Sequence, residues 1–380
     1  KALNANGGTS ISGDGTRVLF GDGHSNKAYM YRINNNALEL EQTLTVSGAT
    51  YLGYTVALNY DGSVAILADQ KYDSSRGRCY VFTRSNRTWS TTKSFDGLGA
   101  KSEMGWGGNS ISMNKDGTIL AVGSVAWGRD TGTDHGRVDI FKYDTSDNKW
   151  KSYANVNGSS ESLGFSVQLN SIGTKLLIGC RQGTNNKVYL YDYNTATNVL
   201  HLSHEFSNAN GYNNFGWSLT MNDECSRIVI GHNTGIVTYV FDGSIWVEQQ
   251  EISDSLIYNV KSNNIGDIIV STNNSNVKIY ESRMSTPELK FDNYNKLTIE
   301  NAPANATTTL KFTPTGSSDT QEVDIGTATS ISISKEGTYS ATIKNADSFT
   351  FTNEVTVSTV GGSNTLNTVL AFHHGNFDNV

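Results

Sequence analysis

The sequence predicts an all-β protein in which a four-stranded unit recurs six times and a smaller β domain follows. Two observations predict it. Short, nearly continuous apolar runs recur along the chain, and a turn motif separates them at regular intervals. The chain has 37 glycines, 3 prolines and 17% charged residues, which is typical of strands joined by many turns. A single core helix or a coiled coil is not expected.

Residues 52–95 show the unit most clearly, with strand-like runs at 54–58, 63–68, 78–83 and 88–95. The second and third runs are almost wholly apolar, as in strands that are covered on both faces. The fourth alternates, as a half-exposed outer strand should. One such sheet cannot bury two apolar faces alone, so it needs copies of itself on either side.

The turn between the first and second runs is Asn59-Tyr60-Asp61-Gly62. Asn at the first position and Gly at the fourth are preferred in a type I turn in which the Gly has positive φ. The motif recurs at residues 114–117, 170–173 and 263–266, and Ser12 begins a variant. The turn at 222–225 has Cys225 in the glycine position, where we expect a strain of about 1 kcal/mol. Repeats of about fifty residues are typical of the blades of a β-propeller.

A glycine followed by an aromatic residue precedes several first strands. The instances are Gly53-Tyr54, Gly105-Trp106, Gly164-Phe165 and Gly216-Trp217. Together with the turns, these units resemble FG-GAP repeats, the blades of integrin-α-type propellers, in the degenerate form of marine microbes and large algal viruses. The resemblance covers residues 9–291 and implies a six-bladed β-propeller, with seven blades as the alternative because integrins have seven. The family's calcium loop is not matched, so we predict no metal and no cofactor.

The predicted blades span residues 9–44, 52–95, 104–153, 163–206, 215–252 and 257–291. We expect the propeller to occupy residues 1–292, an Ig-like β-sandwich residues 293–360, and a linker and tail residues 361–380. The second domain is predicted from runs with period two. Residues 336–341, which include Tyr339, resemble the tyrosine corner of Ig-like domains.

Blade three differs from its siblings by an insertion at residues 106–109 and a long loop at residues 124–135. Loops on one face of a rigid scaffold are the usual place for binding. We therefore predict a binding site on this loop face, shared with the neighbouring loop of blade two. An aromatic ring flanked by charges can stack on a ligand ring and orient it by hydrogen bonds. The predicted site residues are Trp106, Trp127, Arg129, Asp130, His135, Tyr72, Asp73 and Arg76.

Several features have two interpretations. The aromatic residues Tyr54, Trp106, Phe165 and Trp217 either pack between blades or form a stacking platform for a sugar. The acidic pairs Asp69/Asp73 and Asp130/Asp134 are either solvated loop carboxylates or a weak calcium site. Three widely spaced cysteines do not make a disulfide framework, so we expect buried thiols.

Composition excludes some classes of function. The net charge of −7 is spread without runs, whereas a nucleic-acid-binding face would be basic. No run of apolar residues is long enough for a membrane span. No common catalytic motif appears, so we predict that the chain is not an enzyme.

We predict a non-enzymatic surface module for attachment or assembly, as a minor capsid, vertex or fibre component of a large virus. Its location is then the virion surface or the cell exterior. Its partners are other virion or surface proteins, or a host glycan or receptor. The alternatives are a glycan-binding lectin, a microbial adhesion protein, or an enzyme that uses the central channel. Acids or His residues on the first strands would support the enzyme, and those of blades two to five carry hydroxyls instead.

Overall fold

The computed structural model describes residues 7–369 except 36, 108, 130–134, 160–161, 181–186, 255–256, 264–265, 267, 274–275, 282–287, 292–295, 301–306, 329, 333–335, 345–349 and 361–362. The chain divides into two compact units. The first contains Lys1–Tyr239 and Glu248–Glu281, and the second contains Val240–Val247 and Ser282–Val380. Each unit is described by itself below.

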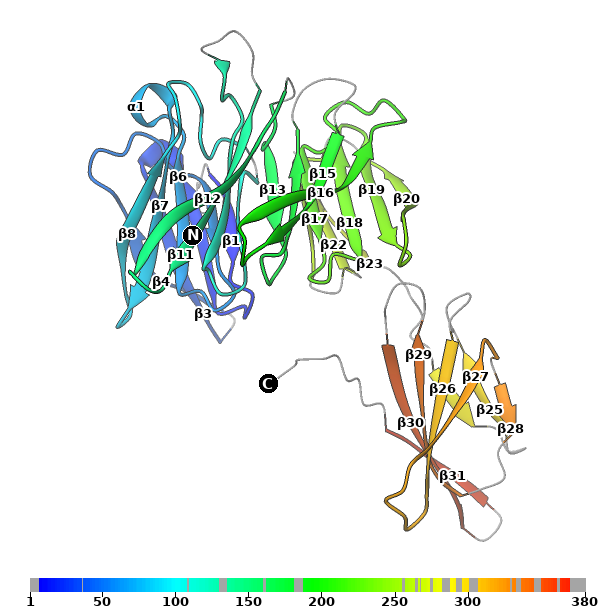
Figure 1. The fold of residues 1–380 in the computed structure, drawn as a ribbon. Helices are drawn as coiled ribbons and strands as arrows, with labels where there is room; N and C mark the ends of the chain where they lie inside the picture. Colours follow the sequence, from blue (N-terminus) through cyan, green and yellow to red (C-terminus); the bar gives the residue numbers. More distant parts are fainter. Residues whose placement is uncertain are drawn as a thin grey trace. The chain divides into compact units, whose positions relative to one another are not determined.

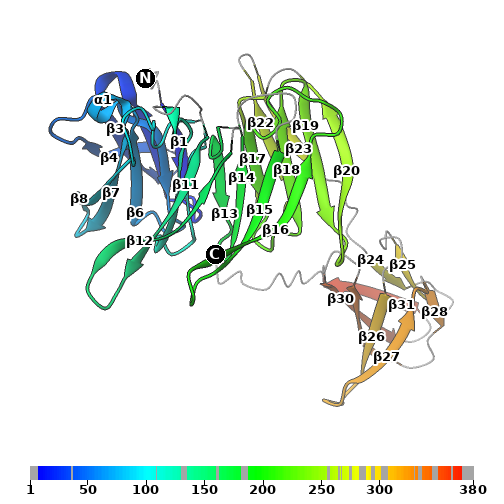
Figure 2. The same ribbon diagram turned by 45° about the horizontal axis from the view of Figure 1, so that its top comes forward.

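The first unit consists of consecutive antiparallel sheets, each built from strands in chain order (Figure 1 and Figure 2). Blade five is described with them, although its segment Val240–Val247 is grouped with the second unit. Blade one has β1 (Thr9–Ile11), β2 (Arg17–Asp22), β3 (Lys27–Asn34) and β4 (Ala37–Leu44). Blade two has β5 (Leu52–Leu58), β6 (Val64–Asp69), β7 (Arg78–Ser85) and β8 (Thr88–Asp96). Blade three has β9 (Ile111–Met113), β10 (Ile119–Ser124), β11 (Arg137–Asp144) and β12 (Lys149–Asn157).

Blade four has β13 (Ser166–Leu169), β14 (Lys175–Gly179), β15 (Lys187–Asn194) and β16 (Val199–Ser207). Blade five has β17 (Ser218–Met221), β18 (Arg227–His232), β19 (Gly235–Phe241) and β20 (Trp246–Ser253). The helical segments with described bounds are the turns η1 (Gly23–Ser25) and α1 (Tyr72–Ser75). The predicted all-β class and the repeated four-stranded sheet are therefore confirmed.

Blade six differs from the prediction. Its sheet has three strands, β21 (Asn259–Ser262), β22 (Ile268–Thr272) and β23 (Val277–Glu281). We expected residues 288–291 to be its fourth strand. Instead β24 (Glu288–Phe291) pairs with β25 (Lys296–Glu300), which pairs in turn with β28 (Ser330–Ser332). In this pairing Leu289 is opposite Ile299 and Phe291 is opposite Leu297.

The second unit also contains a five-stranded sheet, in which Phe312 and Tyr339 are buried and stack with ring centroids 4.6 Å apart. Its strands are β27 (Gln321–Gly326), β26 (Thr307–Pro314), β29 (Gly337–Lys344), β30 (Thr350–Val360) and β31 (Ser363–Val369). Residues 363–369 were predicted to be tail, but they pair with β30. The residues 370–380 of that predicted tail lie outside the described part of the chain.

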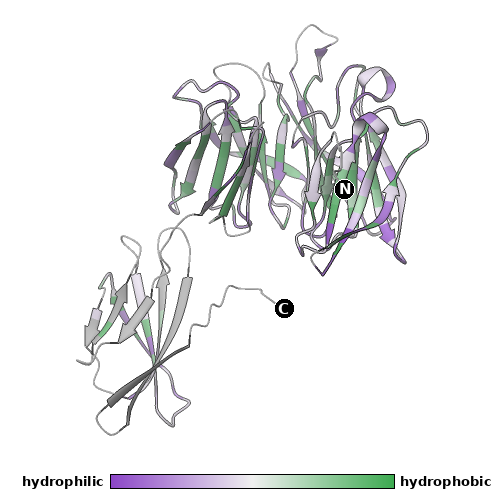
Figure 3. Ribbon diagram, turned by 180° about the vertical axis from the view of Figure 1, so that it is seen from behind, coloured by the Kyte–Doolittle hydropathy of each residue, from purple (hydrophilic) through white to green (hydrophobic). Residues whose placement is uncertain are grey.

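The core of the first unit lies between neighbouring sheets, and Figure 3 shows hydrophobic residues gathered within the sheets. Leu19 and Met30 of blade one pack with Leu67 and Phe82 of blade two. The opposite face of blade two, which includes Val81, packs on blade three. Equivalent clusters join blade three to blade four and blade five to blade six. Sheets inside the series thus bury their apolar faces against their neighbours, as the unbroken apolar runs predict.

The recurring Asn caps the hairpin between the first two strands. The Asn114 side-chain oxygen accepts hydrogen bonds from Thr118 N (2.9 Å) and Ile119 N (2.8 Å). Its amide donates to Thr118 Oγ1 at 3.2 Å. The same pair of backbone bonds is made by Asn59, Asn170 and Asn222. The Asn is buried, so it satisfies amide groups that water does not reach.

The fourth turn position has positive φ in every copy. The values are 63° at Gly62, 67° at Gly117, 74° at Gly173 and 55° at Cys225. The left-handed conformation that we predicted for Cys225 is therefore confirmed.

The glycine ahead of each first strand allows neighbouring sheets to approach closely. A Cβ placed on Gly123 of β10 would lie 1.9 Å from the carbonyl oxygen of Gly164 in the next blade. Gly164 itself has φ of 92°, a region that other residues rarely adopt. The repeated motif in the sequence includes this glycine, and the main-chain contact between blades explains why a glycine is needed there.

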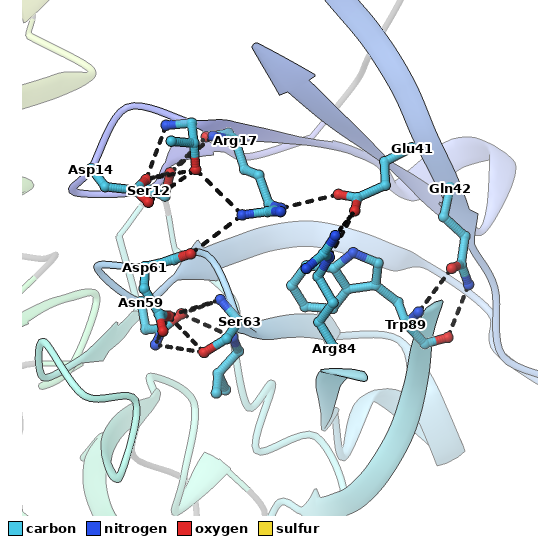
Figure 4. Close-up of polar contacts among 12 residues, drawn as sticks. Ser12, Asp14, Arg17, Glu41, Gln42, Asn59, Asp61, Ser63, Arg84 and Trp89 are labelled. Carbon is cyan, nitrogen blue, oxygen red and sulfur yellow. Dashed lines mark hydrogen bonds and ion pairs between the residues drawn. The ribbon is translucent and has the colours of Figure 1, made fainter. Parts of the chain in front are cut away.

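Polar contacts join the outer strands of blades one and two (Figure 4). Glu41 accepts from Arg17 Nε at 3.1 Å in its own blade and from Arg84 at 2.7 Å in blade two. Gln42 exchanges two hydrogen bonds with the main chain of Trp89. These contacts align β4 with β8 beyond the apolar core.

Asn114→Ala should lower the free energy of unfolding by about 2–4 kcal/mol, because two buried N–H groups lose their acceptor. Asn114→Asp should lose clearly less, because a carboxylate accepts the same two bonds and the Thr118 hydroxyl can donate to it. Denaturant unfolding measures both. Equal losses from the two variants would show that the cap does not depend on the acceptor oxygen.

Candidate functional site

The loops of blades two and three form one continuous rim. The loop between β6 and β7 is bonded to the connection between the two blades, because Glu103 N donates to Ser75 O at 2.8 Å and Met104 N donates to Arg76 O at 3.2 Å. The same connection accepts from blade three through Ala126 N and Ser102 O, 3.2 Å apart. We call residues 71–77, 97–104 and 125–136 the loop rim. The sequence placed both loops on one face, and the structure adds the connection that joins them.

Trp127 folds back on its own loop. Its carbonyl oxygen accepts from His135 N at 3.0 Å and from Gly136 N at 3.1 Å. Its ring is half-buried and lies 5.7 Å from the Arg137 guanidinium and 6.3 Å from the His135 ring. Trp127 and His135 are therefore together, as predicted. Asp130 and Asp134 lie outside the described residues.

Arg129 joins the loop of blade three to the connection, because its guanidinium is 2.9 Å from Glu103 Oε1. In blade two, Arg76 is 3.2 Å from Asp73, and both side chains are partly exposed. Predicted site residues from two loops are thus held in one rim by ion pairs. Exposed ion pairs contribute little to stability, so Arg76 and Asp73 are available to a partner at small cost.

Tyr72 is covered on one face by the Arg78 guanidinium, 3.8 Å from the ring centroid. Arg78 is itself paired with Asp96, which raises the pKa of Arg78. A tyrosine ring with a cation on one face is held in orientation. Tyr72 remains half-buried, so part of the side chain faces solvent.

The rim continues onto blade one, where the sequence predicted no site. The Lys71 ammonium lies 4.0 Å from the centroid of the Tyr51 ring. The Tyr51 hydroxyl is 3.0 Å from His24 Nε2, and His24 belongs to the short turn η1. The sequence signal is Tyr51, which stands directly before the Leu52-Gly53 pair in the connection between blades one and two.

The aromatic residues after the lead glycines contact one another from blade to blade. Ring centroids are 6.1 Å apart for Trp106 and Phe165, 4.6 Å for Phe165 and Trp217, and 6.5 Å for Trp217 and Tyr258. Phe165 is buried with Val125 and Ala126, which fits packing between blades. Trp106 and Trp217 are half-buried and Tyr258 is exposed, so they keep surface for a ligand.

The insertion of blade three reaches across the inner strands. Asn109 O accepts from Val167 N of blade four at 2.8 Å. Asn109 Nδ2 lies 3.0 Å from Ser218 Oγ of blade five and 3.0 Å from Asn259 Oδ1 of blade six. The insertion was predicted to display a binding loop, whereas Asn109 is a buried joint among four blades.

A cavity of about 640 Å³ lies among the inner strands β1, β5, β9 and β21. Its lining is polar, with hydroxyls and amides from residues such as Thr55, Ser112 and Asn109, and Lys261 is the one charged residue in it. The Lys261 side chain is exposed to the cavity, which lies between the inner strands. Burial lowers the pKa of its ammonium to about 8. The sequence could have shown that a charged side chain stands at this position, because Lys261 is in register with hydroxyl residues of other first strands.

Asp69 of the predicted acidic pairs has a structural role. It is fully buried and accepts from Thr50 N (2.7 Å), Thr50 Oγ1 (2.9 Å) and Tyr51 N (2.9 Å). Among the residues that the structure describes, no group of three or more His, Cys, Asp or Glu side chains could hold a metal. No helix in that part of the chain has the length and hydropathy for crossing a bilayer.

No protein-family model matches the chain, and no curated protein matches it. Solved structures do match. Kuenenia stuttgartiensis hydrazine synthase is 12% identical with a TM-score of 0.53, over 73% of this chain and 83% of that one. The β-propeller domain of Cps50 (Swd1) from Myceliophteria thermophila is 11% identical with a TM-score of 0.52, over 72% and 82%. A functionally unknown protein from Desulfotomaculum acetoxidans is 10% identical with a TM-score of 0.55, over 74% and 84%. At these identities the likeness shows the fold alone, which is that of a β-propeller.

Lys261→Met should raise the melting temperature at pH 7. The lysine has a lower pKa in the folded chain (about 8) than its ordinary value of 10.5, so the unfolded chain binds more protons between those values. The destabilising effect of the charge is thus complete below pH 8 and fades as pH rises towards 10.5. The gain from Lys261→Met should fade over the same range.

Lys278→Met is the matched control, because Lys278 is paired with Asp254 at 2.8 Å and its pKa is raised. It should lower the melting temperature at pH 7. A gain from Lys261→Met that does not change with pH would contradict the account of the cavity.

Proposed function

We propose that the chain is a non-catalytic attachment module that binds a glycan on a partner surface through the loop rim. The continuity of the rim carries the proposal. Two loops from different blades and their connection are bonded into one surface that displays Tyr72 and Trp127, each beside a cation. Tyr51, next to the rim, lies beside Lys71 of the rim. Aromatic rings that are held in orientation suit the apolar face of a pyranose, and the flanking charges suit its hydroxyls.

The wider setting rests on the resemblance to FG-GAP repeats. It favours a surface protein of a large virus, as a minor capsid, vertex or fibre component, or an adhesion protein of a microbe. We also propose that the second unit is an Ig-like sandwich, which is supported by its two antiparallel sheets and by the buried Tyr339. The closed propeller that the resemblance implies is also part of this proposal.

One observation favours a second candidate, a ligand site in the centre. The cavity combines a lone ammonium, amides and hydroxyls with exposed aromatic surface at Tyr258. That lining suits a small polar ligand with an anionic group. The loop rim is preferred because its side chains come from the loops that vary most among the blades.

Tyr72→Ala should weaken glycan binding at least about tenfold, the effect expected of losing a stacked aromatic contact. Trp127→Ala should act in the same direction. Binding is measured on a glycan array and then by titration with the best glycan. The control is Tyr60→Ala, which removes an exposed tyrosine that lies beside Lys115 at 4.4 Å but belongs to a hairpin turn rather than the rim. Equal effects of Tyr72→Ala and Tyr60→Ala, or no effect of either, would reject the rim.

A further inference from the structure

In each of blades one to four, one face of the third strand is sealed by the blade that follows. Met30, Val81, Ile140 and Leu190 hold the same register in their sheets, and each is at most 2% exposed. Ile279 holds that register in blade six, because it pairs with Val270 and Val270 pairs with Lys261. Yet Ile279 is 64% exposed, and Val277 on the same face is 69% exposed.

The opposite face of blade one is uncovered in the same way. In blade two the corresponding face contains Leu67, Tyr80 and Phe82, all buried against blade one. Blade one presents Phe20 and Tyr31 on that face, and both are only half-buried. Ile11, next to them in register, is 59% exposed. Val18, opposite Ile11 on this face, is buried. Two apolar faces that neighbouring sheets cover elsewhere in the repeat are therefore only partly covered at its two ends.

Hydrogen bonds between the inner strands also join each blade to the next. A side chain at one register position bonds the main chain of the next blade in four cases. Ser10 accepts from Leu58 N (3.0 Å), Ser112 from Leu169 N (2.9 Å) and Thr220 from Ser262 N (3.1 Å), and Gln168 exchanges two bonds with Met221.

Lys261 occupies this position in blade six. The Lys261 side chain makes no hydrogen bond or ion pair within the described part of the chain. Successive inner strands pack together from β1 to β21, whereas no comparable packing joins β21 to β1 among the described residues.

We propose that the open faces of blades one and six form a seat for one more sheet of the same repeat, joined to the chain ahead of β1. The five interfaces between consecutive sheets indicate which sheet would fit here. It would have large apolar side chains towards Ile279 and small ones towards Phe20. Each sheet enters through its first strand from the outer strand of the sheet before it, and β1 is such a first strand. This inference goes beyond the proposed function and does not depend on it.

In this arrangement Lys261 is a positioning residue. Its ammonium would donate to a main-chain carbonyl of the incoming first strand, as Gln168 Nε2 donates to Met221 O at 3.2 Å. Thr272 stands where Gly21, Gly123 and Gly179 stand in other blades. The added sheet would therefore keep a wider spacing at that end of β22 than the glycine contacts allow elsewhere.

The test adds the missing repeat. A copy of residues 164–207, with its own Cys180 changed to Ala, is placed directly before Lys1. Ile279→Cys is then introduced with and without the added repeat, and its reaction with a thiol reagent is timed. The natural cysteines are buried, so their lack of reaction reports that both proteins are folded. We expect the added repeat to slow the reaction of Ile279→Cys at least about tenfold, as burial under a stable sheet should.

Val199→Cys in the original blade four is the matched control, because Val199 is 57% exposed and lies away from both open faces. Its rate should not change. Equal rates for Ile279→Cys with and without the added repeat would overturn the proposal. So would a slow rate in the unmodified chain, which would mean that another part of it covers the face. A rate that falls with protein concentration instead would assign the face to a second copy.

Discussion

The constraint on which the first unit depends is that each sheet has two apolar faces and can exclude water from them only with its neighbours. The second and third strands of blade two are buried almost throughout, on one side with blade one and on the other with blade three. Burying a side chain such as Leu67 or Val81 contributes about 1.5–3 kcal/mol. No sheet gains both contributions alone, so the repeat and its order along the chain follow from this requirement.

Polar side chains then fix how the sheets meet. Buried Asn residues close the hairpins at one end of each sheet, and hydroxyl or amide groups on the inner strands bond the next main chain. These bonds are directional, whereas apolar packing is not. The first-strand hydroxyls of Ser112 and Thr220 make such bonds between blades, and Ser112 also lines the cavity. Lys261 stands out because it holds such a position without a partner among the described residues.

Much of the fold could be predicted because its signals are local. The apolar runs gave the strands of blade two to within a few residues, and the Asn-x-x-Gly turns gave the phase of the repeat. The positive φ of Cys225 followed from its place in that phase. The prediction that residues 288–291 belong to blade six was wrong, because their sequence is typical of a strand in either sheet. Choosing between two partners is a tertiary effect that a single strand does not encode.

The site was predictable only in outline. The loops of blades two and three were found from their length and composition. Their joining by residues 102–104, and the extension to Tyr51 and His24, depend on contacts between segments that are distant in sequence. Asn109 shows the opposite error, since an insertion that looked like surface display is buried between blades.

Hydrogen–deuterium exchange, resolved by strand, tests the central claim most directly. If sealing by neighbours on both faces stabilises each sheet, amides of β6, β10 and β14 should exchange far more slowly than those of β22 and β23, whose sheet is covered on one face. Equal protection of β14 and β23 would contradict this account, because it would mean that the sheets do not depend on their neighbours.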